Sequence, residues 1–244
     1  MVSAVQTSGR SFERSHYLLD SVDYRLAETP ADREEIYRLR YRAYRGEGAV
    51  APNPSEMVYD RYDDLPNSWI FGVYLDGALM SSLRISVASP EQPEVPSVNV
   101  FPDILGPELA KGKVIVDPTR FVADPAPANR FLELPYMTLR LAYLACEYFH
   151  ADLGLASVRA EHQAFYRRFF MHTISSIRDY PGLIKPIGLL AIDFPSMREK
   201  VFARNPFLRS TYFERRKLFE RTGQGSVVDL PNFPFARATI APGS

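Results

Sequence analysis

The sequence predicts an α+β fold in which helices flank a single mixed β-sheet. Strand-like and helix-like patterns follow one another along the chain without strict alternation, and two strand patterns come in succession near the end. The dipeptide Asp76-Gly77, between two alternating runs, is typical of a two-residue hairpin turn. The apolar run 113–123 suits a central strand but contains Pro118, which cannot donate to a ladder. We therefore expect a central strand that is bulged or splayed.

The first elements follow from local signals. Residues 1–22 are polar without a clear period, and we expect a loose N-terminal arm there. Val22–Ala27 alternates like a short strand, and Thr29 before Pro30 is a strong helix start, because threonine caps free amides and proline fits the first turn. The helix that follows places Arg40 within its apolar stripe, on one face with Ile36, Leu39, Ala43 and Tyr44.

The middle of the chain contains two loop segments and the hairpin. Residues 46–68, rich in Gly, Pro and Asn, predict a long ordered loop. The hairpin arms are Trp69–Leu75 and Ala78–Val87. Residues 88–112, with five prolines, predict a loop insertion containing one short helix near Pro102–Leu109.

The second half predicts the remaining core elements. The expected elements are a helix over 130–150 ended by Gly154, a strand over Ser157–His162 leading into a short aromatic helix, strands at 174–179 and 187–193, helices at 195–204 and 209–221, and a tail over 223–244. With one sheet and no internal repeat, residues 23–222 are expected to form a single domain.

Composition excludes several function classes. Apolar residues make up 46% of the 244, enough for a sizeable core, and acidic and basic residues balance at 29 each. No bulk field therefore favours a nucleic acid or a membrane surface. Cys146 is the only cysteine, and the four histidines lack metal-ligand spacing. No apolar run approaches the roughly 20 residues of a membrane span. We expect a cytoplasmic protein without a metal, a nucleic-acid partner or a membrane span.

Two charged clusters mark the candidate site. The first is Asp60-Arg61-Tyr62-Asp63-Asp64, and the second is Asp117-Pro118-Thr119-Arg120-Phe121 inside the apolar run. Charge in a strand-like apolar run costs several kcal/mol unless it is paired. These residues therefore belong either to a working groove or to a closed ion-pair network, which would also include Arg40 and Arg84.

The order of elements and these residues resemble the GNAT acyltransferase superfamily. More closely, they resemble its branch of acyl-homoserine-lactone (autoinducer) synthases and long-chain N-acyl amino acid synthases. Four pieces spread over residues 24–195 support the resemblance: Arg40 with Tyr44, Asp60-x-Tyr62-Asp63, Arg84 late in the hairpin, and Asp117-x-x-Arg120-Phe121. The resemblance implies a GNAT-like sheet and transfer of an acyl group to an amine.

Two departures from the family pattern bear on which acceptor and which acyl donor we expect. Glu47–Val50 offers no aromatic residue where autoinducer synthases usually carry a tryptophan near S-adenosylmethionine, which favours the amino-acid-acylating relatives. Residues 124–130 contain no glycine, whereas enzymes that bind coenzyme A usually have a glycine-rich loop there whose amides hold the pyrophosphate. A donor carried on the phosphopantetheine of acyl carrier protein needs no such cradle, and a coenzyme A thioester remains possible. No tightly bound cofactor is expected.

The second cluster is expected to contribute the catalytic residues: Asp117, Thr119, Arg120, Phe121 and Val122. The resemblance implies a bulge over Thr119–Val122 whose freed amides polarise the thioester carbonyl. The alternative is an edge strand with a proline and no function. Asp117 either accepts the amine's proton, directly or through a relay, or closes the core through a salt bridge to Arg120 or Arg40.

The substrate-binding candidates are Arg40, Tyr44, Asp60, Asp63, Trp69 and Arg84. The two aspartates either bind the acceptor's ammonium group or pair with Arg40 and Arg84. The arginines Arg84 and Arg120 either contact an acceptor carboxylate or only complete a network. The aromatic residues Tyr44 and Trp69 either line a pocket or belong to the core.

The leading expectation is an N-acyltransferase that moves a fatty acyl group from acyl carrier protein to an amino acid or a similar small amine. The rival activities are an autoinducer synthase that uses S-adenosylmethionine and a coenzyme A-dependent acetyltransferase. The rival from another class is a catalytically inactive acyl-binding protein of the same fold.

Overall fold

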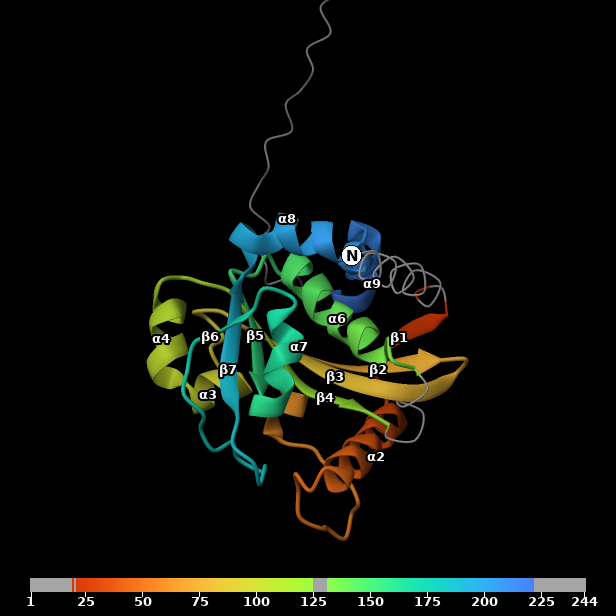
Figure 1. The fold of residues 1–244 in the computed structure, drawn as a ribbon. Coiled ribbons are helices and arrows are strands. Elements are labelled where there is room, and N and C mark those ends of the chain that lie inside the picture. The colour runs from red at the N-terminus through yellow and green to blue at the C-terminus, as the bar shows by residue number, and fades with distance from the viewer. Residues whose placement is uncertain (1–18, 20, 125–130, 222–244) are drawn as a thin grey trace, which may run out of the picture.

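The computed structural model describes residues 19, 21–124 and 131–221, and these build one mixed seven-stranded sheet around two large hydrophobic clusters (Figure 1). The strand order is β1-β2-β3-β4-β5-β7-β6, with β4 and β5 parallel and every other neighbouring pair antiparallel. The strands are β1 (Val22–Leu26), β2 (Ser68–Leu75), β3 (Ala78–Ala88), β4 (Ile115–Ala123), β5 (Leu153–Val158), β6 (His172–Thr173) and β7 (Gly188–Asp193). The α+β fold with a single mixed sheet is confirmed.

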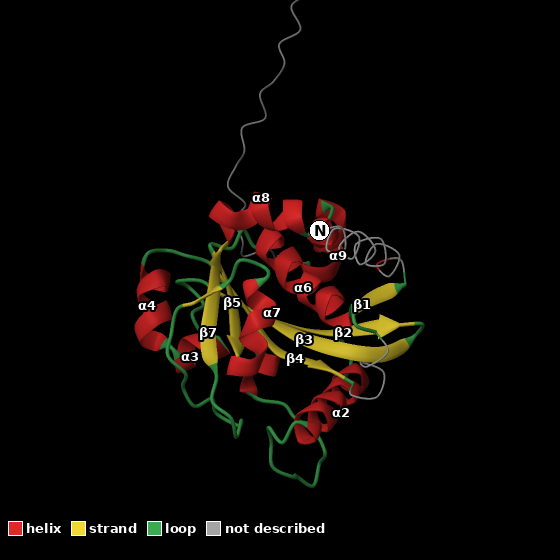
Figure 2. Cartoon of the chain, viewed as in Figure 1, coloured by secondary structure: helices red, strands yellow, loops and turns green. Residues whose placement is uncertain are grey.

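Helices cover both faces of this sheet. They are α2 (Pro30–Gly46), α3 (Pro96–Val100), α4 (Pro102–Ala110), α6 (Leu134–Tyr148), α7 (Gln163–Arg167), α8 (Phe194–Arg204) and α9 (Tyr212–Phe219). Figure 2 shows α2 and α6 on opposite sides of the strands β3 and β4. Helix α6 is buried nearly all round, because α7 and α9 cover the side that the sheet leaves open. Three short 3-10 helices cover Arg61–Asp64, Ala160–His162 and Pro206–Leu208.

Local capping and turn signals act as the sequence predicts. Thr29 caps α2 in a capping box with Asp32, so two otherwise free amides gain partners. Asp76 and Gly77 both have positive φ, as a two-residue hairpin turn that follows the twist of its strands requires.

The central strand β4 is both bulged and splayed, as predicted. Against β3, Val122 pairs with Ser82 and Thr119 with Arg84, so the two residues Arg120 and Phe121 lie opposite one residue of β3. Arg120 adopts a left-handed φ of 55° at this bulge. Against β5, only the first two residues of β4 are paired, and the two strands diverge from Asp117 onward.

Pro118 therefore marks the splay rather than the bulge. It keeps its register with Ile85 of β3 and lies just beyond the last pair with β5. Because proline has no N–H to donate, it suits a position where a ladder ends. The bulge begins two residues later, at the left-handed Arg120.

Several boundaries differ from the sequence prediction. The strand expected at Ser157–His162 lies four residues earlier, as β5, and Gly154 is inside it; a Cβ there would meet Ile192 and Cys146 at 3.1 and 3.2 Å. Tight packing, not a helix end, explains this glycine. The strand expected at 174–179 is wrong: β6 precedes it, and only Arg178 forms an isolated bridge, to Ile187. The expected helix near Pro102–Leu109 is present as α4, and α3 is an additional helix.

The predicted arm over 1–22 and tail over 223–244 lie outside the described residues, except for residues 19, 21 and 22, and Val22 begins β1. Among the described helices, none is both long and apolar enough to cross a membrane.

Candidate active site

The divergence of β4 from β5 opens a cavity of about 650 Å³. Residues of α2 line it on one face of the sheet, and residues of α6 and α7 line it on the other. Its walls are largely apolar or aromatic: Ala43, Tyr44, Pro118, Phe121, Val122, Pro135, Val158, Phe165, Tyr166, Leu183 and Ile187. The size and lining are typical of a small-molecule site.

The bulge of β4 forms one wall of this cavity. Thr119, Arg120, Phe121 and Val122 all line it, together with Tyr44 from α2. The extra residue of a bulge is left unpaired in its ladder, and the β5 side of β4 is unpaired beyond Val116. The predicted juxtaposition of bulged backbone and cavity is therefore present. Tyr44 also packs its ring 5.7 Å from the Arg120 guanidinium.

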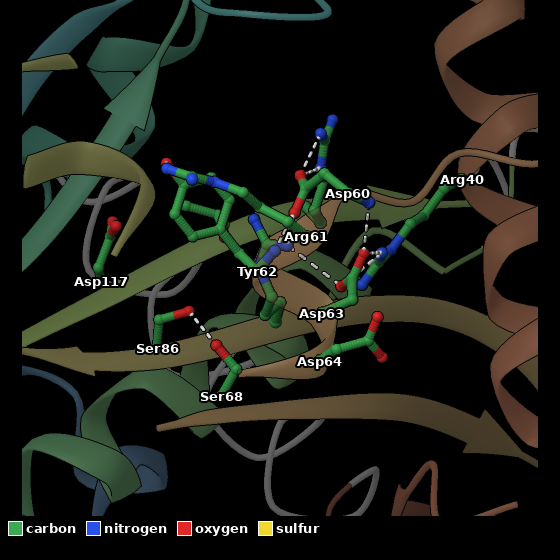
Figure 3. Close-up of polar contacts among 12 residues, drawn as sticks. Arg40, Asp60, Arg61, Tyr62, Asp63, Asp64, Ser68, Ser86 and Asp117 are labelled. Carbon is green, nitrogen blue, oxygen red and sulfur yellow. Dashed lines mark hydrogen bonds and ion pairs between the residues drawn. The ribbon is translucent and has the colours of Figure 1, made fainter. Parts of the chain in front are cut away.

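The arginines and the first-cluster aspartates form a closed ion-pair network on the α2 side of the sheet. Asp63 contacts Arg40 at 2.9 Å and Arg84 at 3.1 Å. Asp60 contacts Arg84 at 2.5 Å and Arg120 at 2.6 Å. Figure 3 shows both carboxylates turned toward the guanidinium groups between α2 and the strands. The two aspartates thus pair with the arginines, as the second of the two interpretations expected.

The electrostatics of the network follow from this pairing. Burial opposes ionisation of Asp60, but the charges of Arg84 and Arg120 outweigh it and lower its pKa to about 2. For Arg40 the balance is reversed, because complete burial lowers its pKa more than Asp63 raises it. Within the part of the chain that the structure describes, the Nε and Nη2 atoms of Arg40 and the Nη2 of Arg84 have no hydrogen-bond partner.

Five substrate-binding candidates do not reach the cavity. Arg40, Asp60, Asp63 and Arg84 bond within the network and are absent from the cavity walls. Arg84 approaches it only through Thr119, whose hydroxyl accepts from Arg84 Nε at 3.0 Å. Trp69 lies in an aromatic cluster with Phe149 and Phe219 and donates from Nε1 to the Phe219 carbonyl. Tyr44 is the substrate-binding candidate that lines the cavity.

Asp117 lies apart from the arginine network. Its side chain is fully buried and makes no ion pair with a described residue, so the expected salt bridge to Arg120 or Arg40 is wrong. Instead, Ser97 of α3 donates its N–H to Oδ2 at 2.8 Å and its hydroxyl to Oδ1 at 2.6 Å. Figure 3 shows Asp117 apart from Arg40 and from the carboxylates of Asp60 and Asp63. Burial raises the pKa of Asp117, and the bonds from Ser97 and the charge of Arg84 oppose that rise.

Comparison with known proteins decides the family. The family profile described as N-acyl amino acid synthase FeeM matches residues 35–193, well over half of the chain. The chain belongs to this family. Family membership identifies it as an N-acyltransferase with a GNAT-like fold.

Solved structures show the same fold at low sequence identity. FeeM, an N-acyl amino acid synthase from uncultured soil microbes, is 19% identical with a TM-score of 0.62, covering 75% of this chain and 96% of FeeM. TofI, solved in a ternary complex with an inhibitor and MTA, is 17% identical with a TM-score of 0.55 over 78% of this chain and 100% of TofI. BjaI, a CoA-dependent acyl-homoserine lactone synthase, is 12% identical with a TM-score of 0.53, covering 77% and 89% of the two chains. No curated protein sequence matches the chain.

Sequence reasoning missed a set of site residues of this FeeM-family chain. Ser157 at the end of β5 lines the main cavity, and with Tyr180 it also lines an adjoining chamber of about 50 Å³. Both chambers share Thr119 and Arg120. Neither Ser157, at the end of an apolar strand, nor Tyr180, in a loop, belongs to a sequence motif, so no local signal identifies them.

Charged residues at one end of the main cavity were also missed. Glu47, Arg159 and Lys185 line it, and Arg159 forms ion pairs with Glu47 and Glu161. The Arg159–Glu47 pair joins the end of α2 to the end of β5. Among the described residues, no group of three or more His, Cys, Asp or Glu side chains is placed to hold a metal ion.

Proposed function

We propose that this FeeM-family enzyme transfers a fatty acyl group from the phosphopantetheine of acyl carrier protein to the amino group of an amino acid or a similar small amine. The observation that carries the proposal is the cavity at the bulge of β4, open through the sheet between β4 and β5. An acyl thioester can enter from one face of such an opening and an amine from the other. The reaction needs both held close and aligned.

The bulge supplies the polarising wall. A thioester carbonyl placed against the unpaired backbone at Arg120 and Phe121 would receive amide hydrogen bonds as negative charge develops on its oxygen. Apolar side chains such as Phe165, Tyr166 and Val122 suit the hydrocarbon chain.

The charged end of the cavity suits an amino acid acceptor. Glu47 offers a negative charge, and Arg159 and Lys185 offer positive ones. A zwitterion carries both an ammonium and a carboxylate, so this end complements it better than it would a purely apolar amine. Asp60, Asp63, Arg40 and Arg84 are proposed to hold α2 and the loop before β2 in place rather than to touch substrate.

The test is incubation of the full chain with long-chain acyl carrier protein, and separately with acyl-coenzyme A, against a panel of amino acids. Mass spectrometry should detect N-acyl amino acids from the carrier-protein donor. Turnover with acyl-coenzyme A but not with acyl carrier protein would overturn the assignment of acyl carrier protein as the donor. Formation of a lactone from S-adenosylmethionine would show that the acceptor is S-adenosylmethionine and not an amino acid. If neither donor gives an acylated amine, the proposal is overturned.

A further inference from the structure

The carboxylate of Asp117 has no direct access to the cavity. Its side chain is fully buried, and it is absent from the walls of both chambers. Both carboxylate oxygens accept from one residue, Ser97 of α3. An aspartate held in this way exchanges a proton with a ligand only through the group bonded to it.

Ser97 continues the path toward the cavity. Its hydroxyl oxygen lies 2.6 Å from the hydroxyl oxygen of Ser157, on β5. Ser157 is partly exposed and lines both the main cavity and the small adjoining chamber. Two hydroxyls therefore join a buried carboxylate to the place where the amine would bind.

The hydrogen-bond directions along this path are fixed by counting protons. A serine hydroxyl has one hydrogen to donate. The hydrogen of Ser97 goes to Asp117 Oδ1, so the bond between the serines must be donated by Ser157. Every donor then points from the cavity toward Asp117, leaving the Ser157 oxygen free to accept from a ligand.

From this geometry, and resting on the proposed function, we propose that Asp117 takes up the acceptor amine's proton through Ser157 and Ser97. The acceptor attacks as the neutral amine, after its ammonium proton has been lost to solvent. As the amine nitrogen bonds to the thioester carbon, the proton that it must still lose passes to Ser157 Oγ. The proton of Ser157 passes to Ser97, and that of Ser97 to Asp117 Oδ1. The carbon–sulfur bond then breaks, and the same path returns a proton to the leaving thiolate. The net products are an amide and a thiol, and Asp117 is ionised again.

The surroundings of Asp117 suit a base that must gain and then lose a proton. Burial favours its neutral form, while Ser97 and the charge of Arg84 on β3 favour the anion. A second titratable group, the phenol of Tyr180, lies beside the small chamber; its pKa is raised mainly by burial and further by the charge of Asp117. Because no cation pairs with Asp117 among the described residues, its proton affinity is not suppressed as that of Asp60 is.

A purely structural role for Asp117 would be to fasten α3 to the sheet, since it bonds the first turn of that helix. The variant Ser157→Ala distinguishes this structural role from a role in proton transfer. It removes the hydroxyl at the cavity and leaves both bonds between Ser97 and Asp117 in place. Ser157→Thr keeps a hydroxyl and serves as the conservative rescue. Ser68→Ala is the matched control, because Ser68 also bonds a second serine, Ser86, at 2.8 Å but away from the cavity (Figure 3).

The experiment measures acyl transfer by the full chain against pH at saturating amine. We expect kcat of Ser157→Ala to fall about 10²-fold or more, with KM nearly unchanged and the acidic limb of the pH profile lost. Ser157→Thr should recover most of kcat, and Ser68→Ala should match the wild type. Asp117→Asn should lose the same limb, and the double variant should be no slower than the slower single variant, because both changes break one path.

The relay is overturned if Ser157→Ala keeps the wild-type kcat and pH profile, or if its loss multiplies with that of Asp117→Asn. It is also overturned if mass spectrometry finds the acyl group on Ser157, since that serine would then be a nucleophile. A wild-type chain that acylates no amine refutes the proposed function and the relay together. Wild-type turnover with an unaffected Ser157→Ala refutes the relay alone.

Discussion

Two polar clusters lie on the same sheet and hold their buried charge in different ways. In the network of Arg40, Asp63, Arg84, Asp60 and Arg120, each carboxylate contacts two guanidinium groups, and only Arg120 also lines the cavity. The path from Asp117 contains no cation and leads through two serine hydroxyls to the cavity wall. The cluster with more charge is the closed one. The number of charged residues is therefore a poor guide to which polar cluster leads to the cavity wall.

The largest expected effect on the ion-pair network comes from removing Asp63. Asp63→Ala removes the only ion-pair partner that the buried Arg40 has among the described residues, and two Arg40 nitrogens already bond to none of them. Breaking a buried pair in this way costs about 3–5 kcal/mol of unfolding free energy. Urea unfolding followed by circular dichroism measures it. The control is Asp64→Ala in the same 3-10 helix, where an exposed pair with Arg33 should be worth at most about 1 kcal/mol. Equal losses in the two variants would contradict a closed, buried network.

The ionisation of Asp60 should make the network's contribution to the free energy of unfolding depend on pH. Its pKa in the folded state is about 2, below the ordinary 3.8, so its ionised form stabilises the fold above about pH 4 and that contribution is lost as pH falls toward 2. The shift corresponds to at most about 2 kcal/mol, because solvent screens the partly exposed carboxylate of Asp60. Asp60→Asn should therefore be less stable than the wild type at neutral pH, with the gap narrowing below pH 4 in denaturant unfolding. A gap that stays constant across that range would rule out this pairing as its source.

Asp117 should show a smaller dependence of the opposite sign. Its folded-state pKa is raised, so the stability that its proton contributes is fully present below the ordinary pKa of 3.8 and is lost as pH rises through the folded-state value. Relative to Asp117→Asn, the wild type should therefore lose unfolding free energy as pH rises from about 4. Matched unfolding curves for the two proteins measure this slope. A slope of the same sign as that of Asp60 would mean that Asp117 is held as a stabilised anion and would weaken its assignment as a base.

Part of the candidate site was predictable from the sequence. The family resemblance implied the bulge over Thr119–Val122, and the pairing of Asp60 and Asp63 with arginines was one of the two interpretations of the charged clusters. The partner of Asp117 was not predictable, because Ser97 lies in a segment that reads as loop and that the structure folds as α3. Trp69 shows the converse: an aromatic side chain that suits a pocket wall in sequence packs in the core beside Phe149.

The sequence by itself determined the elements whose causes are local. Thr29 with Asp32 starts α2, Asp76-Gly77 turns the hairpin, and the apolar run with Pro118 makes a central strand that cannot pair fully. These effects depend on backbone geometry and on neighbours a few residues apart.

Only the tertiary structure decided which polar groups meet. Ser97, Asp117 and Ser157 come from three elements: Ser97 lies 20 residues before Asp117 and 60 before Ser157, and this spacing follows no period. Packing of α3 and β5 against β4 brings them within hydrogen-bond distance. Burial then makes each of them take a partner, because an unsatisfied polar group away from water is costly. The physical reason is that hydrogen bonds between distant segments depend on how the sheet diverges, and that divergence is a property of the assembled strands.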